Sequence, residues 1–351
     1  MGTCDPLNWA LLKLMLRRSV LNKTNHLSDA FAFHKQSHRG TGVSKRIFLQ
    51  STRMASSGAG TGGSFQPIRQ GQAQQQPGYE KHMTPTSEAT KLESEGRFVE
   101  YVGSNKLKGK KALITGGDSG IGRSVAILMA REGADVTIVF LPEEQEDAND
   151  TKKAVEREGK KCLLVPGNLM NNDNCKKAVD EHVSAYDRVD VLVNNASKQI
   201  MCKDFAQIDL DNVASTFQSN ILQMFAITKF AIPHMKKGSS VINTTSVVAF
   251  RGSSSMVDYS STKGAIVSFT RALAKNLAPK GIRVNAVAPG PVHTPIQPAS
   301  RPPEQMEGFG SGSMIGRPGQ PSEIAPTFIW LASNEGALYY GQIMHPYALG
   351  D

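Results

Sequence analysis

The sequence predicts an α/β fold: a single doubly wound parallel sheet of about seven strands with helices on both faces. From residue 108 onward, short apolar runs alternate with longer stretches in which apolar residues have helical spacing. Runs that are apolar throughout indicate strands buried on both faces, because helices cover both sides of a parallel sheet. A glycine-rich segment, "TGGDSGIGRS", follows the first run and opens the first helical stretch, which is typical of Rossmann-type folds.

The expected strands and helices alternate along the domain. The strands are expected at residues 111–115, 135–140, 161–165, 190–194, 240–245, 283–288 and 341–345. The helices are expected at residues 120–132, 143–158, 171–186, 211–236, 258–278 and 321–332. Because ligands of such sheets bind beyond the carboxyl ends of the strands, we expect the chemistry just after each strand.

The chain divides into three parts. Residues 1–78 are expected to be a disordered extension, because residues 56–78 are rich in Gly, Ser and Gln and show no apolar periodicity. Residues 79–107 are polar and mixed, which indicates an arm on the surface of the domain. Residues 108–351 form the domain itself. Within it, residues 291–320 are too long and too rich in Pro and Gly for a simple connection, so they are expected to form the substrate loop.

The positive charge is concentrated at the N-terminus. Residues 1–55 hold nine Lys or Arg and two Asp, so they carry +7 of the chain's net charge of +9. The remainder is nearly neutral, so the basic composition is no argument for nucleic-acid binding. A basic, Ser-containing and acid-poor N-terminus has the composition of a mitochondrial transit peptide. A plain extension and a translation start at Met54 are open alternatives, so the expected compartment is the cytoplasm, or the mitochondrion if residues 1–55 are a transit peptide.

Membrane and metal sites are not expected. No apolar run approaches the ~20 residues that a membrane helix requires. The four cysteines show no metal-like spacing and suggest a reducing compartment. His234, His293 and His345 are scattered without ligand spacing, so we interpret them as surface or hydrogen-bonded residues.

The glycine segment predicts a dinucleotide site. Gly116, Gly120 and Gly122 follow a strand and open a helix, with the spacing T-G-x-x-x-G-x-G. Glycines allow the backbone to approach a pyrophosphate closely, and the phosphates then rest on free N–H groups at the helix N-terminus. Glycines also serve ordinary turns, but this strand-and-helix context favours the dinucleotide.

A second motif places Tyr259 four residues before Lys263, in "DYSSTKGA". Residues i and i+4 lie on the same face of a helix. A phenol titrates near pH ~10, and a neighbouring ammonium favours the phenolate and lowers that pKa. Such a pair also occurs by chance, so the rest of the chain must supply the context.

Further segments after the strands make the pattern specific. They are "NNAS" (194–197), Asn220 in the helix before strand five, Ser246 thirteen residues before Tyr259, and "PGPVHT" (289–294). Together with the glycine segment and the Tyr–Lys pair, this ordered set resembles the short-chain dehydrogenase/reductase family from about residue 106 to the end. "PGYEKHMTP", "LPEEQEDA" and "GRPGQPSEIAP" are similar to the branch of glucose/ribitol-dehydrogenase-like proteins and aldehyde reductases.

The resemblance implies a catalytic set of Asn220, Ser246, Tyr259 and Lys263. Tyr259 would be the general acid for carbonyl reduction, with its pKa brought to about 7 by Lys263 and an oxidised nicotinamide. Ser246 would hydrogen-bond the substrate oxygen, and Lys263 would also hold the nicotinamide ribose. Asn220 would hold a water that connects Lys263 to solvent.

The resemblance also implies the cofactor contacts, namely Gly116, Ser119, Gly120, Ile121, Gly122, Asn168, Asn195, Tyr259, Lys263, Pro289, Val292 and Thr294. NADP(H) is expected, with NAD possible. NAD-preferring members usually end strand two with an acidic residue, whereas Phe140 and Leu141 stand here. Glu143 and Glu144 come next and are expected to point elsewhere. Asn168 replaces the usual Asp near the adenine, and the ending "HPYALGD" departs from the family pattern, which puts subunit contacts in doubt.

The implied activity interconverts a carbonyl and an alcohol on a small molecule, in a homodimer or homotetramer. The substrate stays open between an aldehyde, a polyol and a specialised metabolite. Met201, Met256, Phe250 and Met314 are candidates for an apolar substrate pocket, although such residues more often belong to the core. A sugar-nucleotide epimerase or dehydratase and a catalytically silent dinucleotide-binding protein are the rival hypotheses.

Overall fold

The computed structural model describes residues 65–350. The transit-peptide hypothesis, the alternative start at Met54 and the first part of the predicted disordered extension therefore lie outside the described residues.

The domain is built on a seven-stranded parallel sheet with the order β5-β4-β3-β6-β7-β8-β9. The strands are β3 (Lys111–Thr115), β4 (Asp135–Phe140), β5 (Cys162–Pro166), β6 (Val191–Asn194), β7 (Ser240–Thr244), β8 (Arg283–Val287) and β9 (Ile343–Met344). The chain builds outward from β3 through β5, and then from β6 through β9 on the other side. The reversal between β3 and β6 is the point where doubly wound sheets open a crevice for ligands.

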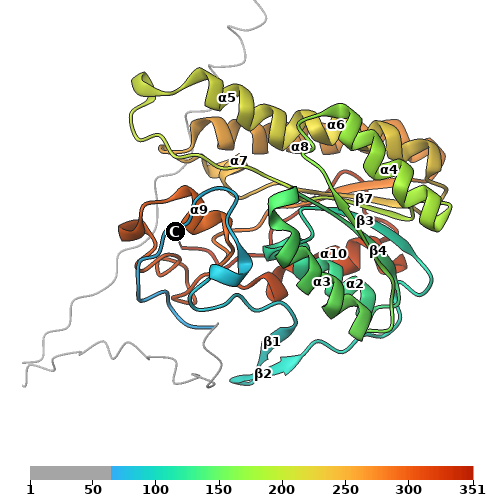
Figure 1. Cartoon of the computed structure of the whole chain (residues 1–351), viewed down its shortest axis with the longest axis horizontal. Helices are drawn as coiled ribbons and strands as arrows, with labels where there is room; N and C mark the ends of the chain where they lie inside the picture. The colour runs from blue at the N-terminus through green and yellow to red at the C-terminus, as the bar shows by residue number, and fades with distance from the viewer. Residues whose placement is uncertain (1–64, 351) are drawn as a thin grey trace, which may run out of the picture. The chain divides into compact units, whose positions relative to one another are not determined.

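Helices cover both faces of the sheet, as predicted (Figure 1). One layer holds α2 (Gly120–Arg131), α3 (Gln145–Arg157) and α10 (Pro321–Ala332). The other holds α4 (Asn172–Tyr186), α5 (Leu210–Phe217), α6 (Gln223–Ala231) and α8 (Val257–Leu277). Short helices α7 (Val248–Arg251) and α9 (Ile296–Ser300) lie in the segments after β7 and β8. The single helix predicted for residues 211–236 is instead interrupted by a π-helical segment, η4 (Gln218–Leu222), between α5 and α6, and closes with a 3-10 turn, η5 (Ile232–His234).

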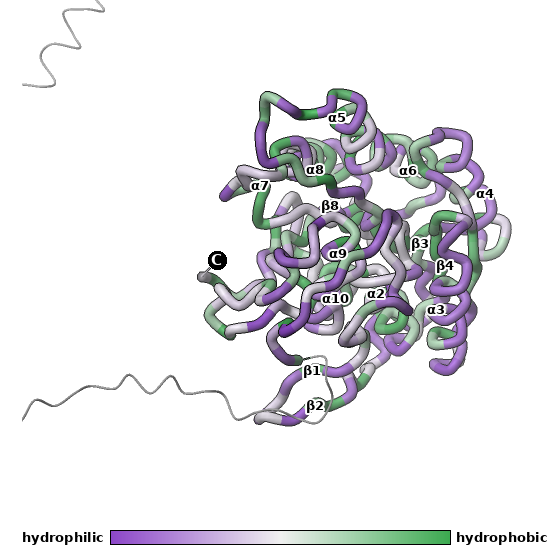
Figure 2. Tube along the Cα trace, turned by 60° about the vertical axis from the view of Figure 1, so that its left-hand side comes forward, coloured by the Kyte–Doolittle hydropathy of each residue, from purple (hydrophilic) through white to green (hydrophobic). Residues whose placement is uncertain are grey.

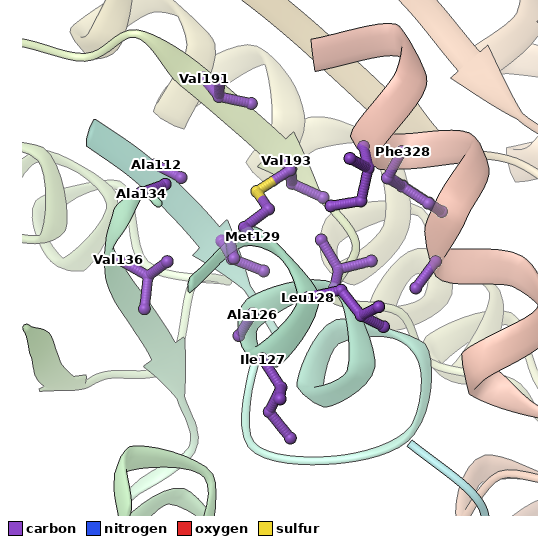
Figure 3. Packing of buried hydrophobic residues seen from close by; sticks show 14 of the residues in the cluster. Ala112, Ala126, Ile127, Leu128, Met129, Ala134, Val136, Val191, Val193 and Phe328 are labelled. Carbon is purple, nitrogen blue, oxygen red and sulfur yellow. The ribbon is translucent and has the colours of Figure 1, made fainter. Parts of the chain in front are cut away.

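The core explains why these segments are apolar. Figure 3 shows Leu128 and Met129 of α2 beside Phe328 of α10, and each of these side chains is 0% exposed. Outer helices are amphipathic: α3 is largely hydrophilic in Figure 2, and it buries Ala148 and Val155, seven residues or about two turns apart. The apolar runs and the helical spacing therefore report burial directly.

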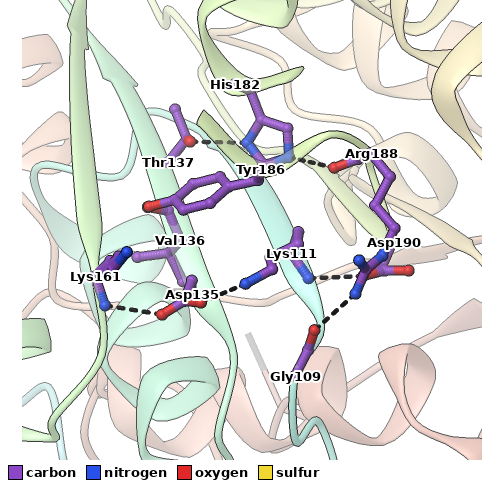
Figure 4. A network of polar contacts seen from close by, with 10 residues as sticks. All are labelled: Gly109, Lys111, Asp135, Val136, Thr137, Lys161, His182, Tyr186, Arg188 and Asp190. Carbon is purple, nitrogen blue, oxygen red and sulfur yellow. Dashed lines mark hydrogen bonds and ion pairs between the residues drawn. The ribbon is translucent and has the colours of Figure 1, made fainter. Parts of the chain in front are cut away.

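The amino-terminal edge of the sheet carries a polar network (Figure 4). Lys111 pairs with Asp135, and its backbone N–H donates to Asp190 at 2.9 Å. His182 forms a hydrogen bond with Thr137, with 2.7 Å between Nδ1 and Oγ1. Burial lowers the pKa of His182 to about 4. These groups pair with one another at the edge opposite the strand ends that carry the motifs, so their role is structural.

Residues 65–78 correct the prediction of a disordered extension. Phe65 stacks on Phe98 with ring centroids 4.1 Å apart, and Ile68 is only 2% exposed. The backbone N–H of Gln74 donates to the carbonyl of Pro298 at 2.9 Å. The segment forms neither helix nor strand, so its few apolar residues show no periodicity even though the domain buries them.

Residues 79–107 are more than a surface arm. They contain a short turn, η1 (Glu80–His82), and a hairpin of β1 (Lys91–Ser94) and β2 (Arg97–Glu100). The two residues between these strands have positive φ, 52° at Glu95 and 73° at Gly96, as two-residue hairpin turns require. The carboxylate of Glu80 is buried and accepts from the N–H of Gly120 at 2.8 Å. The arm therefore supports the glycine loop from outside the sheet.

Candidate active site and cofactor site

A cavity of about 630 Å³ lies at the carboxyl ends of the strands. Segments that follow β3, β4, β6, β7 and β8 line it, as the doubly wound topology predicts. Two further segments close it, residues 76–78, which directly precede the arm, and residues 291–312 of the predicted substrate loop.

The glycine loop forms a cradle that only glycine permits. Gly116 and Gly120 have φ of +61° and +50°. A Cβ on Gly120 would lie 3.0 Å from Cγ2 of Thr294, and one on Gly122 would lie 1.8 Å from the carbonyl oxygen of Gly116. The backbone therefore comes close to the cavity at the N-terminus of α2, where free N–H groups favour phosphate. This geometry fits the pyrophosphate of a dinucleotide.

Asn195 braces this loop. Its Nδ2 donates to the carbonyl of Gly116 at 3.0 Å, and its Oδ1 accepts from Thr244 Oγ1 at 3.3 Å. Its backbone N–H donates to Thr115 Oγ1 at 2.9 Å. Asn195 also lines the cavity, so the "NNAS" segment ties the ends of β3, β6 and β7 together around the site.

The Tyr–Lys pair lies on α8 and faces the cavity. Nζ of Lys263 is 5.2 Å from the centroid of the Tyr259 ring and donates to the carbonyl of Thr244 at 3.0 Å. Lys263 is 1% exposed, whereas Tyr259 keeps some exposure to the cavity. The backbone carbonyl of Lys263 accepts from Thr245 Oγ1 at 2.7 Å, which locks α8 against the end of β7.

Burial shifts the pKa values of both members of this pair. Burial raises the pKa of Tyr259 to about 12, although the charge of Arg301 and a hydrogen bond with Ser246 oppose the rise. Burial lowers the pKa of Lys263 to about 7. A lysine that is half-neutral near neutral pH adds little positive charge beside the phenol. In the protein alone, desolvation therefore dominates the pKa of Tyr259, and its lowering to about 7 by Lys263 together with an oxidised nicotinamide stays a prediction.

Ser246 and Asn220 are placed differently. Ser246 follows β7, lines the cavity, and its Oγ accepts from the N–H of Val248 at 3.3 Å. Asn220 is 0% exposed in the π-helical segment and does not line the cavity. Both donors of its amide are used, by the carbonyl of Lys198 at 2.8 Å and by Thr262 Oγ1 at 3.1 Å. Its Oδ1 accepts from the N–H of Lys198 at 2.6 Å, and a water relay through Asn220 stays a prediction.

The other predicted cofactor residues lie in two groups. Ser119, Ile121, Pro289, Val292 and Thr294 line the cavity, whereas Gly122 packs behind Gly116. A further lining residue, Asn168, is exposed, and its Oδ1 already accepts from the N–H of Met170 at 3.0 Å.

Glu144 corrects the expectation that both acids after β4 point elsewhere. Glu143 is exposed, but Glu144 is buried, lines the cavity, and accepts from the N–H of Leu141 at 3.1 Å. Burial and the charge of Asp118 raise the pKa of Glu144 well above that of an ordinary carboxyl. Glu144 therefore carries less negative charge near neutral pH than an ordinary carboxyl does, which weakens its effect as an anion beside the cavity.

Sequence reasoning missed several lining residues. They come from the segment just before the arm and from the substrate loop: Gln76, Pro77, Gly78, Arg301 and Phe309. No local pattern marks them, because each reaches the cavity from a segment without regular structure. Of the four apolar candidates for the pocket, Met256 lines the cavity, whereas Met201, Phe250 and Met314 do not. His293, interpreted as surface or hydrogen-bonded, is buried and shares a hydrogen bond with the carbonyl of Pro85 at 2.7 Å.

Residues 65–350 contain neither a candidate metal-binding cluster nor a helix that could span a membrane. No group of three or more His, Cys, Asp or Glu in this part of the chain could hold a metal ion. None of its helices is long and apolar enough to span a bilayer.

Comparison with known proteins gives consistent matches. A family model described as enoyl-(acyl carrier protein) reductase matches residues 116–346. The chain is 47% identical to the NADPH-dependent aldehyde reductase 1, chloroplastic, of Arabidopsis thaliana, over 76% of this chain and 95% of that protein. It is 44% identical to the glucose and ribitol dehydrogenase of Daucus carota, over 82% of this chain and 97% of that protein.

A solved structure matches as well. It is a short-chain dehydrogenase from Burkholderia cenocepacia in complex with NADP, with a TM-score of 0.64 and 28% identity. The match covers 68% of this chain and 97% of that one.

Proposed function

Because the chain belongs to the short-chain dehydrogenase/reductase family of oxidoreductases, we propose that it is an NADP(H)-preferring enzyme that interconverts a carbonyl and an alcohol. One observation carries the proposal. The hydroxyls of Tyr259 and Ser246 and the buried amine of Lys263 meet at one cavity, whose other end is the glycine cradle.

Tyr259 is the proposed proton donor. A bound nicotinamide dinucleotide would supply the hydride chemistry, which delivers a hydride to the carbonyl carbon and leaves the carbonyl oxygen in need of a proton. Tyr259 gives its phenolic proton to that oxygen, and Ser246 donates a hydrogen bond to the same oxygen as negative charge develops. In the oxidation direction the same groups act in reverse, and Tyr259 accepts the proton.

The pKa values define what must happen on binding. A phenol with a pKa of about 12 transfers its proton inefficiently at neutral pH, so the bound cofactor has to contribute positive charge. Lys263, with a pKa of about 7, gains a proton easily when an anionic phenolate forms beside it. We infer that Tyr259 and Lys263 titrate together once the cavity is filled.

Two observations support NADP(H) over NAD(H). A relative and a solved neighbour carry NADPH or NADP in their names. In this chain, Phe140 and Leu141 line the cavity where an anionic discriminator would repel a 2′-phosphate, and the raised pKa of Glu144 reduces the negative charge of that acid.

The proposal is tested with purified protein, a panel of aldehydes and ketones, and the loss of NADPH absorbance. Turnover of at least one carbonyl that disappears in Tyr259→Phe supports it. Cofactor binding without turnover of any carbonyl or alcohol would favour the silent dinucleotide-binding protein instead. The convergence of the three catalytic groups speaks against that alternative, because binding alone does not require it. The predicted homodimer or homotetramer is to be tested by light scattering.

A further inference from the structure

Arg301 follows α9 in the substrate loop and lines the cavity that also holds Tyr259 and Ser246. Its charge is close enough to lower the pKa of Tyr259. The guanidinium therefore lies in the part of the cavity where the reaction is proposed to occur, and it has no role in the proposed proton or hydride transfer.

The contacts of Arg301 hold its head group without neutralising it. One guanidinium nitrogen, Nη1, donates to Oε1 of Gln297, and Cζ lies 5.1 Å from the centroid of the Phe309 ring. Among residues 65–350, no carboxylate lies within 4.0 Å of it. A neutral amide and an aromatic ring orient a guanidinium and leave its charge free for a ligand.

Two other arginines, the partly buried Arg131 and the buried Arg317, show the contrast. Arg131 pairs with Glu100 at 2.9 Å and with Glu158 at 2.7 Å. Arg317 pairs with Glu93 and with Glu323, each at 2.8 Å. Arg317 resembles Arg301 in lying over an aromatic ring, that of Phe65, at 5.1 Å. Arg301 differs from both because it lines the cavity and forms no ion pair with a carboxylate among residues 65–350.

The charges that line the cavity are separated. Among its described lining residues the carboxylates are Asp118 and Glu144, which follow β3 and β4 beside the glycine loop. Arg301 comes from the segment after β8, and its charge acts on Tyr259. An anion is therefore favoured near Tyr259, where no lining carboxylate repels it.

We propose that Arg301 binds an anionic group of the substrate, so that the enzyme acts on an aldehyde, ketone or alcohol that carries a carboxylate or a phosphate. This inference rests on the proposed function. The planar fork of a guanidinium matches both anions by paired hydrogen bonds. The pyrophosphate of the cofactor is the other anion that enters this cavity, and the experiment separates the two.

The test uses matched pairs of carbonyl compounds with the full-length protein and NADPH. Succinic semialdehyde is compared with butanal, and glyceraldehyde 3-phosphate with glyceraldehyde. The wild type should prefer the anionic member of at least one pair, and the preferred pair identifies the anion. Arg301→Gln should lose about 10- to 150-fold in kcat/KM for that anionic member, the effect expected from charge-assisted hydrogen bonds. For the neutral member it should change less than about 3-fold, because no charge is involved.

The matched control is Arg157→Gln, since Arg157 is exposed at the end of α3 and does not line the cavity. Equal kcat/KM for both members of both pairs in the wild type overturns the proposal. So does an Arg301→Gln variant that loses both members equally and binds NADPH more weakly, because Arg301 then serves the cofactor. If no carbonyl is turned over, the proposed function fails, and the anion site is then tested by calorimetric binding of succinate to the NADP⁺-loaded protein. Loss of succinate binding in Arg301→Gln supports the anion site. Unchanged binding in Arg301→Gln, or no binding in the wild type, overturns it.

Discussion

His182 should make the protein less stable in mild acid. Its side chain is 0% exposed, and burial lowers its pKa from 6.5 to about 4. Between these values the unfolded chain binds a proton that the folded chain excludes, so stability falls as the pH drops through this window. The loss attributable to this one group is about 2 kcal/mol near pH ~5 and about 3 kcal/mol once the pH is below both pKa values.

The perturbation is His182→Gln, which keeps a polar side chain facing Thr137 and the carbonyl of Arg188 but cannot titrate. The free energy of unfolding is measured by urea denaturation near pH ~7 and pH ~5. The variant is expected to be less stable overall, so the informative quantity is the change with pH. The wild type should lose about 2 kcal/mol more than the variant on acidification.

Other buried groups also titrate in this pH range, so the wild type has to be compared with the variant. Burial raises the pKa of Asp118 and of Glu144, so protonation of these acids stabilises the folded state as the pH falls and opposes the effect of His182. The difference between wild type and variant removes their contribution. His82→Gln, at an exposed position, is the control and should keep the wild-type slope. Parallel pH dependence in wild type and His182→Gln would refute the reasoning.

Three further predictions concern function and the arm. Tyr259→Phe should lower kcat by about 10²- to 10⁴-fold with an unchanged Kd for NADPH, because only the transferable proton is lost. Steady-state rates and cofactor titration measure the two quantities, and an unchanged kcat would show that Tyr259 is not the acid/base residue. The ratio of kcat/KM for NADPH to that for NADH should be about 10 to 150, and Glu144→Gln should preserve it near neutral pH because the raised pKa of that carboxyl already reduces its negative charge; a preference for NADH would show that the acid reaches the ribose. Deleting residues 1–78 should lower the free energy of unfolding by about 3–6 kcal/mol relative to deleting residues 1–64, since it removes the buried side chains of Phe65 and Ile68. Equal melting temperatures for the two truncated proteins would show that residues 65–78 do not pack on the domain.

The strands and most helices could be predicted because burial leaves a local record in the sequence. The expected strands at 111–115 and 135–140 coincide with β3 and β4. The expected helix at 321–332 coincides with α10. Strands buried on both faces must be apolar throughout, and helices that cover a sheet must be apolar on one side, whatever the rest of the chain does.

The meeting of the motifs was predictable for a similar reason. Each motif follows a strand, and parallel strands end at one edge of a sheet, so Gly116, Asn195, Ser246 and Tyr259 had to come together once the sheet formed. The order of the strands, β5-β4-β3-β6-β7-β8-β9, did not follow from this alternation and was given by the structure.

Tertiary structure alone decided the features that depend on contacts between distant segments. The π-helical interruption at Asn220 occurs together with hydrogen bonds from Asn220 to Lys198 and Thr262. The spacing of residues in the sequence does not predict these contacts. Burial, rather than residue type, sets the high pKa of Tyr259. Whether Arg301 meets a carboxylate or an open cavity depends on how an irregular loop folds back over the sheet. Such loops are held by isolated contacts instead of a repeating pattern, so the sequence by itself names their residues and leaves their neighbours undetermined.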